Sequence, residues 1–142
     1  MAYNLISPQQ RGSQDSVNFT STEALLASDV QPGAKLEGGV EILGPVRVEE
    51  MATIGQGAVL SAGVTIGSEA VVKDGVEMWP GSSTGVNSTL HSRAKVLSGA
   101  SVGNRTIVAP ETSVPANMQT KSWQHISINP RNGQLEEHDL PN

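Results

Sequence analysis

The sequence predicts an all-β protein, a parallel β-helix of about five triangular coils with short segments outside the repeat at both ends. Three observations predict this fold class. With the single exception of Thr84, an aliphatic residue recurs every six positions; a small or β-branched residue stands two positions before each of these, and glycine is concentrated in between. A fixed period without insertions or deletions is the signature of a repeat architecture. The fifteen positions of the first series are Val30, Leu36, Ile42, Val48, Ile54, Leu60, Ile66, Val72, Met78, Thr84, Leu90, Val96, Val102, Val108 and Val114.

The two series of residues predict short strands with one inward face. Alternate residues of a strand point to the same side, so each aliphatic residue shares its face with the small residue two positions earlier. Three strands and three corners then close one coil, and successive coils stack about 4.8 Å apart through backbone hydrogen bonds. Fifteen hexapeptides make five coils, which we assign to residues 30–116.

Glycine marks the corners between the predicted strands. It follows the aliphatic residue directly in some repeats, as at Gly55 and Gly67, and lies three positions after it in others, as at Gly57 and Gly63. We expect glycine to permit positive φ angles in these tight corners. Asn87 occupies one of the same positions, and asparagine tolerates that conformation better than most residues.

The repeats Ile54–Val59 and Ile66–Val71 resemble the hexapeptide, or isoleucine-patch, repeat of left-handed parallel β-helix proteins. The resemblance extends over residues 30–114 and implies a left-handed coil, an exception to the usual right-handed crossover. The family includes acyl-CoA-dependent acyltransferases, γ-class carbonic anhydrases, carboxysome proteins and purely structural domains. The fold alone therefore does not determine the function.

Residues 1–29 precede the repeat and are predicted to form an N-terminal cap. The polar stretch Pro8–Ser16 is expected to be a loop. Ser21 is a suitable N-cap for a short helix that ends near Ala27. Solenoid ends expose apolar residues, so this segment is expected to cover the first coil.

Residues 117–142 form a C-terminal tail outside the repeat. Trp123, Ile126 and Ile128 are apolar residues in a short extended run, and the segment Asn129–Gly133 is a strong turn signal. We expect this tail to pack back on the coils or on a neighbouring subunit.

Composition disfavours several classes of partner. The chain has 142 residues, a formal net charge of −5 and no cysteine. The negative charge disfavours nucleic-acid and anionic-membrane partners, and the lack of cysteine excludes disulfides and thiolate metal sites. The segment Met1–Pro8 has no signal-peptide pattern and no stretch is long enough to span a bilayer, so a cytoplasmic location is expected.

His91 is the only histidine within the coils, and it occupies a corner position. In the acyltransferases that the sequence resembles, a single histidine near a subunit boundary is the general base for the acceptor. The resemblance therefore makes His91 a candidate catalytic residue. Against catalysis, the coils carry no loop insertion, and cationic Lys73 is its predicted neighbour one coil earlier. A solvent-exposed corner residue is the alternative interpretation.

A metal site is not predicted. The carbonic anhydrases of the family use three histidines for each zinc ion, and the coils contain one. His125 and His138 belong to the tail and could contribute only if the tail folds back.

Two surfaces are candidate oligomer interfaces. The outward residues of one predicted face carry no charge over four coils: Thr53, Val71, Thr89 and Ile107. One corner stacks Leu43, Ser61, Trp79, Leu97 and Pro115. Contiguous exposed apolar surface in a protein often marks an interface, although the tail is an alternative cover for the corner.

These observations favour a non-catalytic structural or assembly module, a homotrimeric β-helix without a cofactor, with the tail or an exposed face available to another protein. The alternative is an acyltransferase that uses acetyl-CoA or another acyl-CoA with His91 as general base. A γ-carbonic-anhydrase-like protein is a more distant third.

Overall fold

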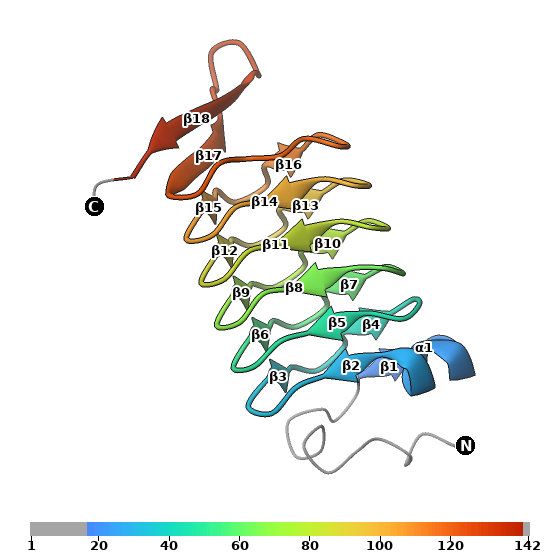
Figure 1. Cartoon of the computed structure of the whole chain (residues 1–142). Helices are drawn as coiled ribbons and strands as arrows, with labels where there is room; N and C mark the ends of the chain where they lie inside the picture. The colour runs from blue at the N-terminus through green and yellow to red at the C-terminus, as the bar shows by residue number, and fades with distance from the viewer. Residues whose placement is uncertain (1–16, 141–142) are drawn as a thin grey trace.

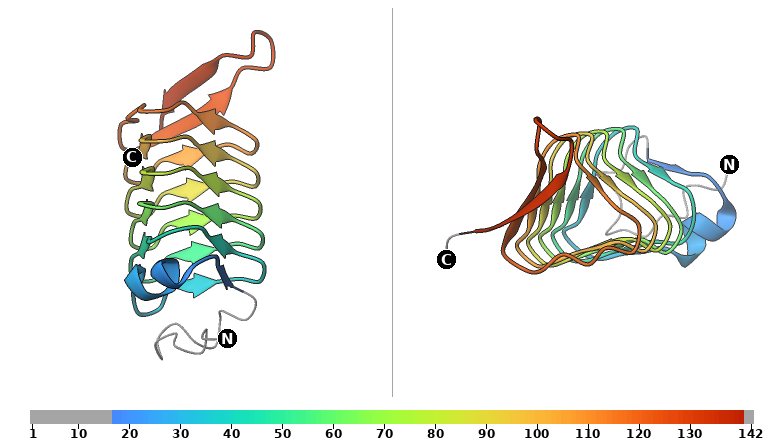
Figure 2. Two further views of the ribbon diagram at one scale, coloured as in Figure 1. Left: turned by 90° about the vertical axis from the view of Figure 1, so that its right-hand side faces the viewer. Right: turned by 90° about the horizontal axis from the view of Figure 1, so that it is seen from above.

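The computed structural model describes residues 17–140, and it is a three-sided β-solenoid (Figure 1). The segments Met1–Pro8 and Pro8–Ser16, interpreted above from sequence, lie outside the described residues. Three parallel sheets form the sides of the solenoid, and the view along the axis shows the triangular outline of the stacked coils (Figure 2). The predicted all-β fold class is thus confirmed.

Three sheets, which we call A, B and C, share the strands in rotation. Sheet A contains β1 (Asn18–Phe19), β4 (Glu41–Ile42), β7 (Val59–Leu60), β10 (Glu77–Met78), β13 (Lys95–Val96) and β16 (Ser113–Val114). Sheet B contains β2 (Asp29–Val30), β5 (Arg47–Val48), β8 (Thr65–Ile66), β11 (Ser83–Thr84) and β14 (Ser101–Val102). Sheet C contains β3 (Lys35–Leu36), β6 (Thr53–Ile54), β9 (Val71–Val72), β12 (Thr89–Leu90), β15 (Ile107–Val108), β17 (Gln124–Ile128) and β18 (Leu135–Asp139).

Each coil repeats the register of the coil before it. Val71, for example, pairs with Thr53 on one side and with Thr89 on the other. The chain passes from sheet B at the front of Figure 1 to sheet C at the left and then to sheet A behind, rising as it turns. That sense of rotation is left-handed, as the sequence resemblance implies.

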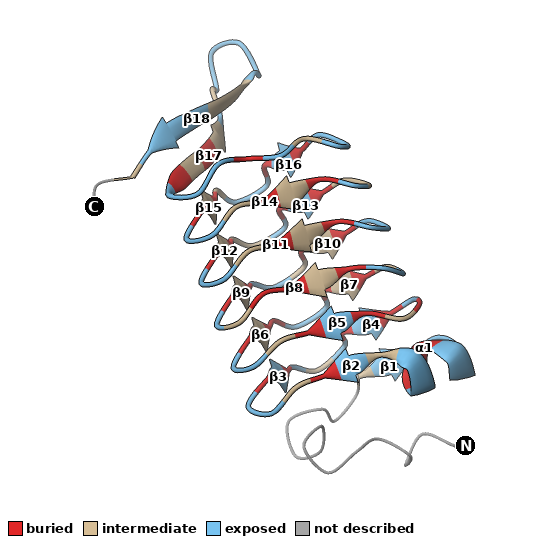
Figure 3. Cartoon of the chain, viewed as in Figure 1, coloured by how far each residue is buried: buried red, intermediate tan, exposed pale blue. Residues whose placement is uncertain are grey.

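The core is a narrow column of inward-pointing side chains along the axis. Every strand of the coils has one buried residue, and Figure 3 colours buried positions red along the backbone. All fifteen positions of the aliphatic series are buried, and Ile66 in the middle coil is completely inaccessible. Fully burying a side chain of this size contributes about 1.5–3 kcal/mol. The residues two positions before the aliphatic series are also buried, from Ala34 to Thr112. Ser28, the first of them, lies in the first coil and is half-buried.

The glycines of the coils fall into two structural groups. The expectation that all of them permit positive φ is therefore wrong for one group. The glycines that lie three residues after the aliphatic residue have positive φ, for example +70° at Gly57. Gly67, which follows the aliphatic residue directly, is not in that group. A Cβ at Gly67 would come within 2.5 Å of the Gly85 carbonyl carbon and 2.8 Å of the Val86 nitrogen. Close approach of two coils, rather than backbone conformation, requires glycine there.

The N-terminal end is covered by one strand and one helix. Helix α1 (Thr22–Ala27) begins after Ser21, whose hydroxyl accepts a hydrogen bond from the Ala24 N–H at 3.0 Å. The predicted cap is therefore present, and Leu25 buries its side chain in the core. Strand β1 was not predicted; Phe19 pairs with Ile42 in sheet A and extends that sheet by one strand.

The C-terminal tail is a β-hairpin that continues sheet C beyond the last coil (Figure 1). Strand β17 pairs in parallel with β15, and Ile126 enters the core with no exposed surface. Strand β18, which was not predicted, runs antiparallel to β17 after the predicted turn. Because the hairpin belongs to sheet C, it does not cover the corner at Trp79, which is 42% exposed.

No helix within residues 17–140 is long and apolar enough to cross a bilayer.

Candidate functional site

Every coil has three corners, and the candidate residues lie at or beside them. The A/B corner follows the strands of sheet A, the B/C corner follows those of sheet B, and the C/A corner follows those of sheet C. His91 directly follows β12 and therefore belongs to the C/A corner.

The backbone of His91 is fixed by coil stacking. Its N–H donates to the Val108 carbonyl at 3.0 Å, and its carbonyl accepts from the Ala94 N–H at 3.1 Å. The residue is half-buried, and Lys73 occupies the equivalent position one coil earlier. Within residues 17–140 the imidazole makes no hydrogen bond or ion pair; the histidine ring with such a contact is that of His138. Among residues 17–140, no side chain therefore fixes the tautomer of this ring.

The three histidines do not converge on one point. His125 in β17 lies directly opposite His138 in β18, whereas His91 is on a corner two coils earlier. In the described part of the chain, no group of three or more histidine, aspartate or glutamate side chains is placed to hold a metal ion. The three-histidine zinc site of the carbonic anhydrases is thus not assembled within residues 17–140.

The hairpin has its own polar cluster around Glu136. The Asn129 amide donates to Glu136 Oε2 at 2.6 Å, and His138 Nε2 lies 3.1 Å from Glu136 Oε1. Two hydrogen bonds lower the pKa of the Glu136 carboxyl below its usual value. The bond from Asn129 has the larger effect, and the bond from His138 has the second largest. This cluster links the two ends of the hairpin loop and is remote from the coils.

The predicted interface residues form two separate surfaces. Thr53, Val71, Thr89 and Ile107 are stacked on the outer face of sheet C, where all four are half-buried. Leu43, Trp79 and Leu97 lie along the A/B corner, where Leu43 is 44% exposed. In a triangular prism the A/B corner is opposite sheet C, so one chain does not bring the two groups together.

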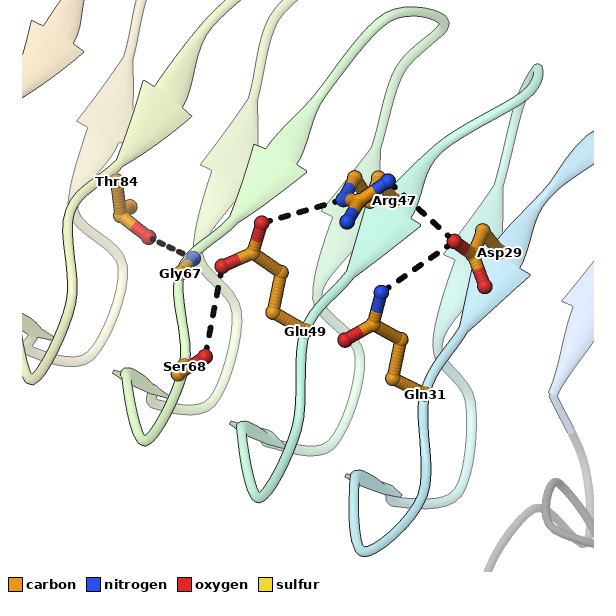
Figure 4. A network of polar contacts seen from close by, with 7 residues as sticks. All are labelled: Asp29, Gln31, Arg47, Glu49, Gly67, Ser68 and Thr84. Atoms are coloured by element: carbon orange, nitrogen blue, oxygen red, sulfur yellow. Dashed lines mark hydrogen bonds and ion pairs between the residues drawn. The ribbon is translucent and has the colours of Figure 1, made fainter.

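A polar network extends along sheet B towards the B/C corner (Figure 4). The Arg47 guanidinium contacts Asp29 Oδ2 at 3.5 Å and Glu49 Oε2 at 3.2 Å. The Ser68 hydroxyl donates to the other oxygen of Glu49 at 3.5 Å. Exposed ion pairs of this kind contribute at most about 1 kcal/mol to stability, but they hold Glu49 in place.

An open groove, which no pattern in the sequence had indicated, begins at Glu49 and follows the B/C corner. Its volume is about 370 Å³, and its lining includes the outward hydroxyls of Thr65, Ser83 and Ser101 together with the side chain of Asn104. Three of the glycines that directly follow an aliphatic-series position, Gly67, Gly85 and Gly103, also line the groove.

The same corner carries a ridge of non-glycine residues with positive φ, which we call the B/C ridge: Met51, Glu69, Asn87, Arg105 and Trp123. The other corners have glycine at most of the equivalent positions. Arg105 stacks on Trp123, with its guanidinium carbon 5.1 Å from the centre of the indole ring. Residues at one corner recur every eighteen positions, which is one full coil. Comparing residues at that spacing in the sequence would have shown that this corner differs from the other two.

Comparison with known proteins supports the fold. No protein-family profile and no curated protein matches the sequence. Among solved structures, PerB from Caulobacter crescentus, in complex with CoA and GDP-perosamine, is similar over 85% of this chain with 15% identity and a TM-score of 0.50. The fold is the hexapeptide-repeat β-helix.

Two further similar structures have lower TM-scores. A mutant perosamine N-acetyltransferase from Caulobacter crescentus, also in complex with CoA and GDP-perosamine, gives 20% identity and a TM-score of 0.43, covering 85% of this chain and 57% of that one. A hexapeptide transferase family protein from Anaplasma phagocytophilum gives 14% identity and 0.41, covering 89% and 76%. The chain spans about half the length of PerB, 54%.

Proposed function

We propose that this protein is an acyl-CoA-dependent acyltransferase with His91 as the general base. The observation that carries the proposal is a half-buried imidazole at a coil corner of this fold, with no hydrogen-bond or ion-pair partner among residues 17–140. The similarity to PerB, which was solved with CoA and a nucleotide sugar, supports the choice of acyl-CoA as donor. The acyltransferase alternative thereby replaces the structural module as the leading hypothesis.

The proposed reaction transfers an acyl group from the thioester sulfur to an amine or hydroxyl of the acceptor. The neutral imidazole of His91 removes a proton from the acceptor as its nitrogen or oxygen attacks the thioester carbonyl. The carbon–sulfur bond then breaks, and the CoA thiolate takes the proton from the protonated His91, so that CoA leaves as the thiol and the imidazole is neutral again. General-base catalysis of this kind typically contributes about 10²–10⁴-fold to the rate.

Assembly is part of the same proposal, because the C/A corner borders the outer face of sheet C. A homotrimer in which each A/B corner packs against sheet C of the next copy would be a closed, head-to-tail ring. It would cover both the uncharged face at Thr89 and the indole of Trp79. It would also place a second chain beside His91, where the monomer leaves the ring open to water.

The test is release of free CoA from acetyl-CoA in the presence of a panel of amino and hydroxyl acceptors. We expect turnover with the wild-type protein and a loss of about 10²-fold or more in His91→Ala. His125→Ala is the matched control, since that ring lies in the hairpin. Equal turnover in wild type and His91→Ala would exclude His91 as the base.

A non-catalytic assembly module is the second candidate, and one observation favours it. Trp79 and Leu43 remain exposed at a corner that the chain's own tail does not cover. If the purified protein has no turnover with any acceptor and retains a different protein through this corner, the module is the better description.

A further inference from the structure

The C-terminal hairpin places two histidines side by side on one face. His125 in β17 is directly opposite His138 in the antiparallel partner β18. Directly opposite residues of an antiparallel pair have their side chains on the same side of the sheet, with Cβ atoms about 4.5–5.5 Å apart. The two imidazoles therefore start from neighbouring backbone positions and can reach a common point between the strands.

The neighbouring residues show that this face points outwards. Ile126 has no exposed surface and lies in the core, so His125, the adjacent residue of the strand, points away from it. His125 also pairs with Ile107 and continues the outer face of sheet C. The hairpin projects beyond the last coil (Figure 1), and the side chain of His138 is 61% exposed. An ion in solution can therefore reach the pair.

A carboxylate orients one of the two rings. His138 Nε2 lies 3.1 Å from Glu136 Oε1, and an ionised carboxylate only accepts hydrogen bonds. In the neutral ring, Nε2 therefore carries the proton and Nδ1 keeps its lone pair. The Asn129 amide holds the other oxygen of Glu136 at 2.6 Å. Histidines that bind metal ions usually donate their second ring N–H to a carboxylate in this way, so the supporting contacts of a metal ligand are already present.

The donor atoms select the class of ion. Neutral imidazole nitrogens suit Zn²⁺, Cu²⁺ and Ni²⁺, whereas Mg²⁺ and Ca²⁺ prefer oxygen ligands. Two protein ligands are fewer than the three of a typical catalytic zinc site, so an ion bound here keeps positions for water. The arrangement differs from the three-histidine site considered above, because His91 lies on a coil corner and has no part in it.

We propose that His125 and His138 form a binding site for a divalent transition-metal ion, with Zn²⁺ as the test ion and water in the remaining coordination positions. Glu136 is a positioning residue, which fixes the tautomer of His138 without contacting the ion. Since the ion connects β17 with β18, its binding stabilises the hairpin. The site is remote from His91, so metal binding and the proposed acyl transfer are tested separately.

The experiment is a titration of the full, untagged chain with ZnCl₂ near neutral pH, followed by the imidazole resonances of its three histidines. We expect saturable shifts of His125 and His138 at one ion per chain, with His91 unchanged. His125→Asn and His138→Asn should each weaken binding by at least about tenfold, the loss typical even of a supporting residue. His91→Ala is the matched control and should bind zinc like the wild type.

A second readout is amide exchange in β18. Protection should rise with Zn²⁺ in the wild type but not in His125→Asn, because a single imidazole does not connect the two strands. Equal zinc affinity in the wild type and in both histidine-to-asparagine variants, or shifts that do not saturate, would overturn the proposal.

Glu136→Gln tests the positioning role. The amide shifts of the hairpin should stay close to those of the wild type, while the zinc affinity falls by about tenfold. Glu137→Gln is the control, because Glu137 is opposite Ile126 and therefore on the other face of the hairpin. Unchanged zinc affinity in Glu136→Gln would contradict the positioning role.

Discussion

At the residue scale, one side chain in three points into a bore too narrow for anything larger than isoleucine, leucine or methionine beside a small residue. The packing is one-dimensional, so each inward residue contacts the equivalent residue of the coil before and the coil after. Thr84 fits this column because threonine has nearly the shape of valine. The inward series contributes most of the apolar surface that folding buries.

The inward series makes a direct prediction about stability. Ile66→Ala should lower the free energy of unfolding by about 2–5 kcal/mol, because a cavity remains in the closely packed middle coil. Thr65→Ala, next to it in β8 but outward-facing, is the control and should cost well under 1 kcal/mol. Chemical denaturation of the two variants measures the difference, and equal midpoints would contradict the inward and outward assignment.

The second residue-scale prediction separates the two groups of glycine. Gly57→Ala should cost about 1–2 kcal/mol, because its φ is positive but nothing lies within 4 Å of an added Cβ. Gly67→Ala should cost more, about 3 kcal/mol, since backbone atoms of the next coil would have to move. Thermal unfolding of the two variants decides; a larger loss in Gly57→Ala would be inconsistent with close coil approach at Gly67.

How far sequence predicts structure depends on whether a residue belongs to the period. The coils, the inward series and the cap at Ser21 were predictable because each follows from local spacing or local chemistry. The groove was not, since its lining comes from residues that are neighbours only after the coils stack. The second role of glycine was not predictable for the same reason. The atoms that exclude a side chain at Gly67 belong to the next coil.

At the element scale, the ends of the solenoid are the least regular parts. Strand β1 pairs with β4 although α1 interrupts the repeat between them, so no period of six leads to it. At the other end, β17 was predicted from its apolar residues, while the exposed, acidic β18 carries no such pattern. This last strand is stabilised by its pairing with β17 over five residues rather than by burial of its side chains.

The hairpin should depend on pH through Glu136. Its pKa is lowered from 4.5 in the folded state by the hydrogen bonds from Asn129 and His138. A lowered folded-state pKa stabilises the hairpin above pH 4.5, and the contribution is lost as the pH falls through the folded value. We therefore expect the protection of the β18 amides, that is, their exchange relative to the intrinsic rate at each pH, to decrease as the pH falls below 4.5.

Two variants test this dependence on Glu136. Glu136→Gln keeps an acceptor for Asn129 but cannot titrate, so β18 exchange, corrected for intrinsic rates, should lose its dependence on this carboxyl. Glu137→Gln, the adjacent exposed residue, should behave like the wild type. The same profile in wild type and Glu136→Gln would refute the assignment.

At the scale of the whole molecule, the outer face of sheet C and the A/B corner, two surfaces that residues 17–140 do not cover, lie on opposite sides of the prism. A closed ring of three copies would bring the A/B corner of each against sheet C of the next. Thr53→Glu combined with Val71→Glu should disrupt this ring, because two like charges would be buried without partners. Light scattering gives the mass: a trimer in the wild type and in the control Ser113→Glu, but a monomer in the double variant. An unchanged trimer mass in the double variant would place the interface elsewhere.

Acyl-CoA binding is the central claim, and a thermal titration of the wild-type protein with acetyl-CoA tests it most directly. A ligand at 100 times its dissociation constant should stabilise the folded state by about 2.7 kcal/mol. We expect a saturable rise in the melting temperature in both wild type and His91→Ala, because the base is needed for transfer rather than for binding. A melting temperature that does not change across the whole titration would contradict the acyltransferase proposal.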